Sequence, residues 1–146
     1  MKNLYAQQKN RHQKEMNAFP LGACFSNEQF DQMMRNWGLT PKDTDKICSV
    51  GGGCYVRKSD SATFCEMLNR FVKEREEAIA ADKTGDGFIY HMFLYELANH
   101  EYCITFDLEE TLDALDLTME QINADKRLLH GLQKAEKEYL KHCEDY

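Results

Sequence analysis

Hydrophobic residues recur at helical spacing over most of the chain. The clearest stretch lies between Asp60 and Asp82, where apolar side chains fall on one face and predict a long amphipathic helix. Residues 88–104 are apolar nearly all round, which predicts a buried central helix. Residues 1–17 are polar with a thin apolar line, and residues 125–140 carry leucines at helical spacing. The pattern therefore predicts a helix at each end of the chain.

Local signals add helix starts and one sheet element. Ser26 with Gln29 has the spacing of a capping box, and Thr118 with Gln121 predicts the start of another helical turn or two. The run ICSVGGGCYVR at residues 47–57 has apolar residues on both sides of three glycines, which predicts a hairpin. Together these patterns predict a predominantly helical α+β fold with about five to six helices and one small β-hairpin near residues 47–57.

Length and composition favour one folded domain. The 146 residues are 42% hydrophobic and 11% aromatic, enough to bury a core. We expect a single domain over residues 1–146, with residues 1–18 as a polar N-terminal helix or arm and residues 19–146 as the globular core. No apolar run reaches the ~18 residues of a membrane helix, and the start MKNLY is unlike a signal peptide. We therefore expect a cytoplasmic protein without a membrane partner.

Charge is distributed unevenly along the chain. Residues 1–75 carry 12 Lys or Arg against 8 Asp or Glu, whereas residues 76–146 carry 6 against 17. Between Lys83 and Lys126 there is no Lys or Arg, and there are ten Asp or Glu. A surface of one sign attracts partners of the other sign, so this window predicts an acidic partner-binding face. Its expected members are Glu96, Glu101, Asp107, Glu109, Glu110, Asp113, Asp116 and Glu120.

Two details qualify the acidic face. In a continuous helix, Glu109, Asp113, Asp116 and Glu120 would form one stripe. A protein that merely solvates its exposed helices would have the same composition, so that interpretation stays open. The acidic balance argues against direct nucleic-acid binding, which needs a basic surface.

Two sets of residues are alternative metal sites. Asp82, Thr84 and Asp86, followed by Gly87, match the opening of an EF-hand calcium loop, but the twelfth position is Phe93 and not the bidentate Glu. A helix-ending glycine and an Asp-Gly turn explain the same residues. The other set is a zinc site of Cys48, Cys54, His100 and Cys103. The six cysteines form no C-x-x-C pair and are expected to be small buried residues, so we predict no cofactor.

Two further constellations are weaker. Glu96 and His100 lie four residues apart and could transfer protons in a small enzyme, yet no nucleophile is paired with them in the sequence. The favoured interpretation is a buried histidine satisfied by its neighbour in a protein that is not an enzyme. Arg57 and Lys58 follow the three glycines as in a phosphate loop, but Arg57 stands where that loop needs glycine. They stay candidates for contact with an anion.

The runs GGGCYVRKSD, ADKTGDGFIYHMFLYELANHEYC and TLDALDLTMEQI support a resemblance that spans about residues 19–135. They resemble small uncharacterised proteins carried on bacterial mobile elements and prophages. The resemblance implies no catalytic residues. It implies a context, because small acidic accessory proteins of phages and plasmids are often antagonists of host defence, including anti-restriction and anti-CRISPR proteins.

The expected function follows from this context and from the acidic face. We expect a non-enzymatic protein-binding accessory protein that inhibits a nucleic-acid-handling defence effector by imitating nucleic acid. The expected partner is a protein with a basic nucleic-acid-binding groove, such as a CRISPR effector or a restriction enzyme, in the cytoplasm of a bacterial host cell.

Overall fold

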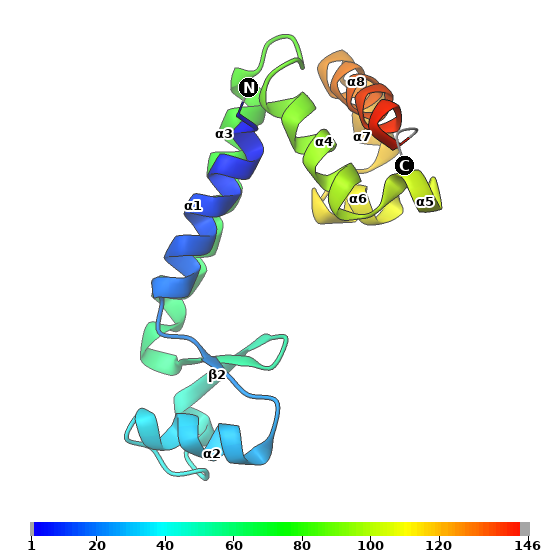
Figure 1. Ribbon diagram of the computed structural model, residues 1–146. Helices are drawn as coiled ribbons and strands as arrows, with labels where there is room; N and C mark the ends of the chain where they lie inside the picture. Colours follow the sequence, from blue (N-terminus) through cyan, green and yellow to red (C-terminus); the bar gives the residue numbers. More distant parts are fainter. Residues whose placement is uncertain (1, 144–146) are drawn as a thin grey trace. The chain divides into compact units, whose positions relative to one another are not determined.

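The computed structural model describes residues 2–143, which form two compact units (Figure 1). One unit, here the helical unit, comprises the residues up to Arg11 together with those from Glu74 onward. The other, here the sheet unit, comprises His12–Lys73. Helices α1 (Leu4–Ala18) and α3 (Ser61–Ala81) contribute residues to both units. The expectation of one domain over the whole chain stays a prediction.

The helical unit is built on the packing of α4 (Phe88–Asn99) against α8 (Lys126–Cys143), which lie side by side in Figure 1. α4 buries residues on every side, as its apolar sequence predicts, and Phe93 and Leu97 are inaccessible to solvent. The two helices approach closely at Gly131, where an added Cβ would lie 2.5 Å from Cγ2 of Ile89. Buried residues of both helices belong to the hydrophobic core of the unit, whose burial stabilises the fold.

The predicted helix over residues 88–104 is wrong in its extent. α4 ends at Asn99, Glu101 adopts a left-handed backbone with φ of 52°, and a separate turn, α5 (Tyr102–Thr105), follows. Two further short helices, α6 (Glu109–Ala114) and α7 (Met119–Ala124), lead to α8. Because the sequence around the break has no glycine or proline, hydrophobicity alone did not reveal it.

The sheet unit contains the predicted hairpin. β2 (Ile47–Gly51) and β3 (Cys54–Arg57) pair antiparallel around three glycines that all have positive φ, a conformation that glycine adopts without strain. β1 (Gly22–Ala23) adds a third strand, which the sequence did not predict, and the order is β1-β3-β2. α2 (Asn27–Asn36) begins at its predicted cap, because the side chain of Ser26 accepts a hydrogen bond from the backbone of Gln29.

Two 3₁₀ turns complete the sheet unit. η1 (Thr44–Lys46) precedes β2, and η2 (Lys58–Asp60) joins β3 to α3, so the predicted amphipathic helix begins after a tighter turn. Val56, Phe64 and Met67 form one hydrophobic cluster of its core, and Met33 and Met34 on α2 are also buried. The predicted fold class, α+β and predominantly helical, is confirmed.

Within residues 2–143, no helix is both long and apolar enough to cross a membrane.

Candidate functional site

The expected calcium loop is a helix cap in the structure. The carboxylate of Asp82 accepts hydrogen bonds from the backbone amides of Gly85, Gly87 and Ile89 at 3.0–3.1 Å, so it closes the loop and begins α4. Burial by itself would raise the pKa of Asp82, but these backbone hydrogen bonds outweigh it and hold the pKa below the usual range. The carboxylate is thus committed to stabilising the local backbone.

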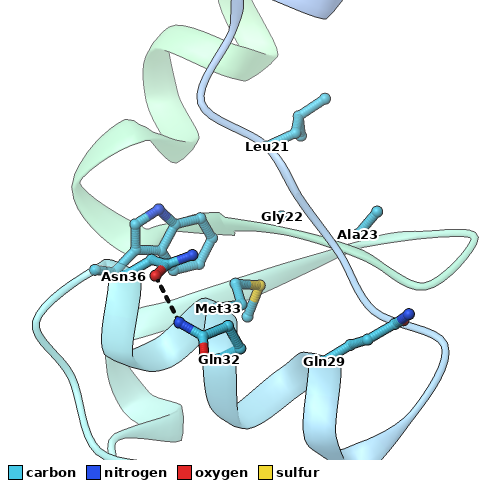
Figure 2. A pocket seen from close by; sticks show the side chains of 8 residues that line it. Leu21, Gly22, Ala23, Gln29, Gln32, Met33 and Asn36 are labelled. Atoms are coloured by element: carbon cyan, nitrogen blue, oxygen red, sulfur yellow. Dashed lines mark hydrogen bonds between the residues drawn. The ribbon is translucent and has the colours of Figure 1, made fainter.

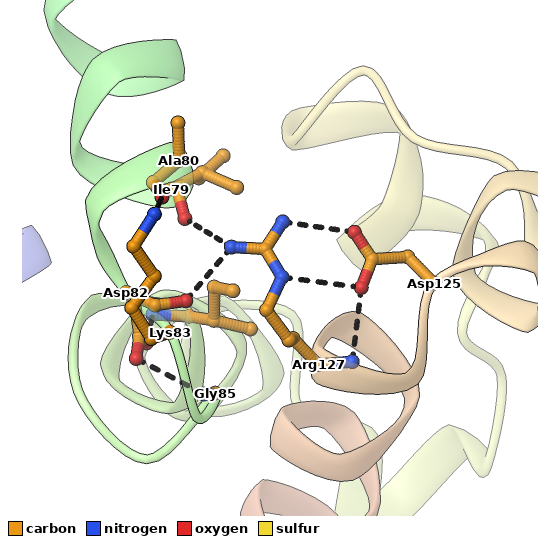
Figure 3. Close-up of polar contacts among 8 residues, drawn as sticks. Ile79, Ala80, Asp82, Lys83, Gly85, Asp125 and Arg127 are labelled. Carbon is orange, nitrogen blue, oxygen red and sulfur yellow. Dashed lines mark hydrogen bonds and ion pairs between the residues drawn. The ribbon is translucent and has the colours of Figure 1, made fainter.

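Arg127 holds the end of α3 (Figure 3). Its Nη1 donates to the carbonyls of Ile79 at 3.0 Å and of Asp82 at 2.8 Å, which lie at the end of the helix, where carbonyls lack helical partners. Its Nη2 and Nε pair with the carboxylate of Asp125 at 2.9 and 3.3 Å. This bidentate pair fixes the guanidinium, so the start of α8 is tied to the end of α3.

The other oxygens of the expected calcium loop point to different partners. The hydroxyl of Thr84 accepts from the backbone of Asp86, whose carboxylate contacts His130 Nε2 at 2.7 Å and Lys134 Nζ at 3.0 Å. In the part of the chain that the structure describes, no group of three His, Cys, Asp or Glu side chains comes together to hold a metal ion. The geometry of this loop therefore favours the structural interpretation.

The expected zinc ligands are divided between the two units, and the zinc site stays a prediction. Cys48 on β2 and Cys54 on β3 are half-buried in the sheet unit, and they are not register partners, since Cys48 lies opposite Val56. His100 belongs to the helical unit, and the side chain of Cys103 lies outside the described residues.

Glu96 is the most deeply buried charged group in the described chain. Its Oε1 accepts hydrogen bonds from the hydroxyl of Tyr5 at 2.6 Å and from Nζ of Lys9 at 2.9 Å, both on α1. Burial would raise the pKa of Glu96, but the hydrogen bonds from Tyr5 and Lys9 outweigh it and lower the pKa. Burial also raises the pKa of Tyr5, and the bond to Glu96 adds to this, so the phenol stays protonated. Glu96 thus joins α1 to α4, and it does not belong to an exposed acidic face.

His100 lies beside this cluster at the end of α4. Its Nε2 is 3.2 Å from Oε2 of Glu96, yet this buried nitrogen has no hydrogen-bond partner in the described structure. Its Nδ1 is 3.5 Å from Oε2 of Glu110 on α6. The expected proximity of Glu96 and His100 is therefore confirmed, but the expectation that Glu96 satisfies the histidine is wrong, because Nε2 forms no hydrogen bond within the described residues. The other oxygen of Glu96, Oε1, is engaged by Tyr5 and Lys9. This arrangement fits a structural tether better than a free general base.

The remaining residues of the expected acidic face are exposed. They lie in residues 101–120, here the acidic segment, and are Glu101, Asp107, Glu109, Glu110, Asp113, Asp116 and Glu120. The stripe that a continuous helix would give from Glu109 to Glu120 is not formed, because α6 ends at Ala114 and Asp116 adopts a positive φ of 54°. The acids therefore lie on the two short helices α6 and α7, in the turn between them and in the segment before α6, with no Lys or Arg among them.

Two large apolar side chains project from the same segment. Ile104 is 71% exposed and Phe106 is 67% exposed. Ile104 lies on α5, and Phe106 follows the end of this turn. The two residues that flank the turn, Glu101 and Phe106, both have a left-handed backbone conformation. Such conformations cost on the order of 1–3 kcal/mol each and are found where surrounding structure holds them. Here Tyr102 is buried and its hydroxyl donates to Glu136 on α8 at 2.9 Å, which anchors the turn and leaves the two apolar side chains in solvent.

The sheet unit contains two neighbouring cavities that share Trp37. One, of about 360 Å³, lies between β1 and α2 and is lined by amide side chains of Gln29, Gln32 and Asn36 (Figure 2). The other, of about 280 Å³, is lined by the two residues predicted to contact an anion, Arg57 and Lys58. The structure thus brings these two basic residues to a concave surface.

Fold and surface together define a small helical protein with an acidic, partly apolar segment and a separate sheet unit. The chain belongs to a family of unknown function (DUF7659), which it matches over residues 4–138. No curated protein and no solved structure matches it.

Several contributors to these sites were not identified from the sequence. Tyr5 and Lys9 gave no signal of their partnership with Glu96, because they are about ninety residues away in the chain. Ile104 was expected to continue a buried helix and is instead exposed. Trp37, which lines both cavities of the sheet unit, was not identified as a site residue. Its position just before Gly38, where a helix is expected to end, was the one sequence feature that could have drawn attention to it.

Proposed function

We propose that this protein is a non-enzymatic binding protein whose acidic segment occupies a basic groove of a partner protein. The observation that supports this most directly is the exposure of Ile104 and Phe106 within a segment rich in acids and free of bases. Interfaces combine apolar anchors, which supply affinity, with charged surroundings, which set orientation and association rate. The acidic segment presents both.

The charge of the segment indicates the chemistry of the partner. Seven exposed carboxylates without intervening Lys or Arg favour a surface dense in basic side chains. Grooves that bind nucleic acid have that composition, because they neutralise phosphates. We therefore place the partner among nucleic-acid-handling proteins of a bacterial host cell, in its cytoplasm, and more narrowly among defence effectors such as CRISPR effectors and restriction enzymes. The acidic segment would compete there with DNA or RNA.

A cleavage assay tests this proposal. Purified protein is added to a panel of restriction endonucleases and DNA-cleaving CRISPR effectors, and DNA cleavage is followed with and without it. We expect inhibition of at least one effector, with weaker inhibition at high salt because surface electrostatics are screened. Absence of inhibition and of binding across the panel would overturn the assignment to nucleic-acid-handling partners.

Two charge variants distinguish an effect of the acidic segment from an effect of the overall charge of the protein. The test variant neutralises four acids of the segment, namely E109Q, D113N, D116N and E120Q. The control neutralises four acids outside it that form no ion pair within residues 2–143, namely E28Q, D31N, E66Q and E76Q. Glu110 is left unchanged because it contacts His100. We expect the test variant to associate about 10-fold or more slowly and the control to behave as the native chain. Equal inhibition by both variants would refute a role for the acidic segment.

The apolar anchors have their own test. The variant I104S/F106S changes side chains that already face solvent, so the fold should persist, as circular dichroism can verify. We expect faster dissociation from the effector, since loss of buried anchors acts mainly on the dissociation rate. Unchanged dissociation would show that charge alone carries the binding.

A further inference from the structure

The cavity that contains Arg57 and Lys58 combines an aromatic wall with a cluster of positive charge. Trp37, at the end of α2, and Leu39, in the loop after it, supply the apolar wall. Lys46 at the end of η1, Arg57 at the end of β3 and Lys58 at the start of η2 supply the charge. Its volume of about 280 Å³ is close to the lower end of the ~300–1,000 Å³ range of small-molecule sites.

The positive charge is only partly compensated. Asp45 is the acidic residue in the cavity wall, and Asp60 pairs with Nε of Arg57 at 2.9 Å. The guanidinium carries five N–H donors, and this ion pair engages one nitrogen. Lys46 and Lys58 are exposed, and within residues 2–143 neither forms an ion pair. In a chain of net charge −7, this cavity is a local site for an anion.

We infer that this cavity binds a planar aromatic ring that carries a phosphate, as a nucleotide does. Arginine and lysine are the side chains that bind phosphate through charge-assisted hydrogen bonds. An indole provides a stacking surface for a base, and such stacking is largely independent of base identity. The juxtaposition of Trp37 with three basic residues therefore matches the two halves of the ligand. The limited volume favours a mononucleotide or the end of a strand over a dinucleotide cofactor.

The neighbouring amide-lined cavity is a poorer candidate for the phosphate. Its polar side chains already bond to nearby groups, since Nε2 of Gln32 donates to Oδ1 of Asn36 at 2.9 Å and Gln29 accepts from the backbone of Phe25 at 2.7 Å. The residues that line it carry no charge. The phosphate is therefore assigned to the cavity with the basic residues, and this assignment does not depend on the acidic segment.

The chain has a built-in probe for this site, because Trp37 is its one tryptophan. The full-length protein is titrated with AMP, GMP, CMP and UMP, and with adenosine and inorganic phosphate separately, while Trp37 fluorescence is followed. Calorimetry with the same ligands checks the result without an optical signal. We expect saturable quenching by at least one nucleotide, weaker binding of adenosine and of phosphate, and an affinity that falls as salt is added.

Matched lysine variants locate the site. K46Q/K58Q removes two charges from the cavity, and K14Q/K42Q removes two exposed lysines of the same unit that do not line it. We expect K46Q/K58Q to weaken binding at least about 10-fold, since charged hydrogen bonds to phosphate are strong, and K14Q/K42Q to leave it within about 2-fold. The inference is overturned if no nucleotide binds, if adenosine binds as well as AMP, or if the two variants behave alike.

A last comparison identifies the source of the ligand. A short single-stranded oligonucleotide with a 5′-phosphate is titrated beside the same strand without it. Tighter binding of the phosphorylated strand than of AMP, with the same dependence on Lys46 and Lys58, identifies the end of a nucleic-acid strand as the ligand. Tighter binding of AMP identifies a free nucleotide.

Discussion

The buried bond between Tyr5 and Glu96 makes the sharpest stability prediction. Substitution of Tyr5 by Phe removes the hydroxyl that donates to Oε1 of Glu96 at 2.6 Å and retains the ring. That ring packs edge-on against Phe88 and Tyr95, with centroids 5.8 and 5.3 Å away, so the apolar contacts should survive. The variant therefore isolates one hydrogen bond to a buried charge.

The magnitude follows from the surroundings of the carboxylate. Hydrogen bonds to charged groups contribute about 1.5–3 kcal/mol each. Lys9 continues to hold the same oxygen at 2.9 Å, so Glu96 is not left without a partner. We expect Y5F to lower the free energy of unfolding by about 2 kcal/mol. For a chain of this size the corresponding decrease in Tm is about 4–8 °C.

Urea unfolding followed by circular dichroism measures this change. Tyr95→Phe is the matched control, because Tyr95 lies beside Tyr5 and its hydroxyl makes no hydrogen bond within the described chain. We expect the control to change the free energy of unfolding by less than about 0.5 kcal/mol. The double variant Y5F/E96Q should show a coupling energy of about 1–2 kcal/mol. Equal effects of Y5F and Y95F, or a coupling energy of zero, would refute the tether.

The same bond has a defined pH dependence. Glu96 has a lowered pKa in the folded protein, so its contribution is fully present above the ordinary glutamate pKa of about 4.3. It is lost as the pH falls through the lowered folded value, because the carboxyl then becomes protonated. The difference in stability between the native chain and Y5F should therefore be constant near neutral pH and shrink in strong acid. A difference that grows with acidity would contradict the assignment.

Three further predictions concern packing, capping and histidine. Gly131→Ala should lower the free energy of unfolding by about 1–3 kcal/mol, because its Cβ would lie 2.5 Å from Ile89. Gln133→Ala, on the exposed face of α8, is the control and should change it by under about 0.5 kcal/mol in the same urea assay. Asp82→Ala should lower the free energy of unfolding by about 1–2 kcal/mol and speed amide hydrogen exchange at the start of α4. Unchanged exchange would argue against a capping role for Asp82. Burial lowers the pKa of His91 in the folded protein, so the free energy of unfolding should decrease as the pH falls below the ordinary histidine pKa of about 6.5, and H91Q should not show this decrease.

Features encoded within a few residues were predictable. The capping box at Thr118 is present in both directions, because the Thr118 hydroxyl accepts from the backbone of Gln121 and the Gln121 side chain accepts from the backbone of Thr118. The hairpin turns at its three glycines, and Ser26 begins α2. Each of these depends on side chains and backbone groups within about four residues, so the local sequence contains all the necessary information.

Features that depend on distant residues were not predictable in detail. Residues 88–104 contain no glycine or proline, so the usual helix-ending signals did not place the break at Glu101, which the docking of Tyr102 on α8 helps to hold. Asp82 has the residue type of a calcium ligand, but the geometry turns its carboxylate toward three backbone amides.

The sequence alone determined the helical α+β class, the hairpin, the helix caps and the acidic window without Lys or Arg, because these follow from spacing and composition. The tertiary structure decided which acids face solvent. It buried Glu96 against Tyr5 and Lys9 and left the acids of the acidic segment exposed around Ile104 and Phe106. The physical reason is that burial of a charge depends on partners from distant segments, and the one-dimensional order of residues does not specify which segments will meet.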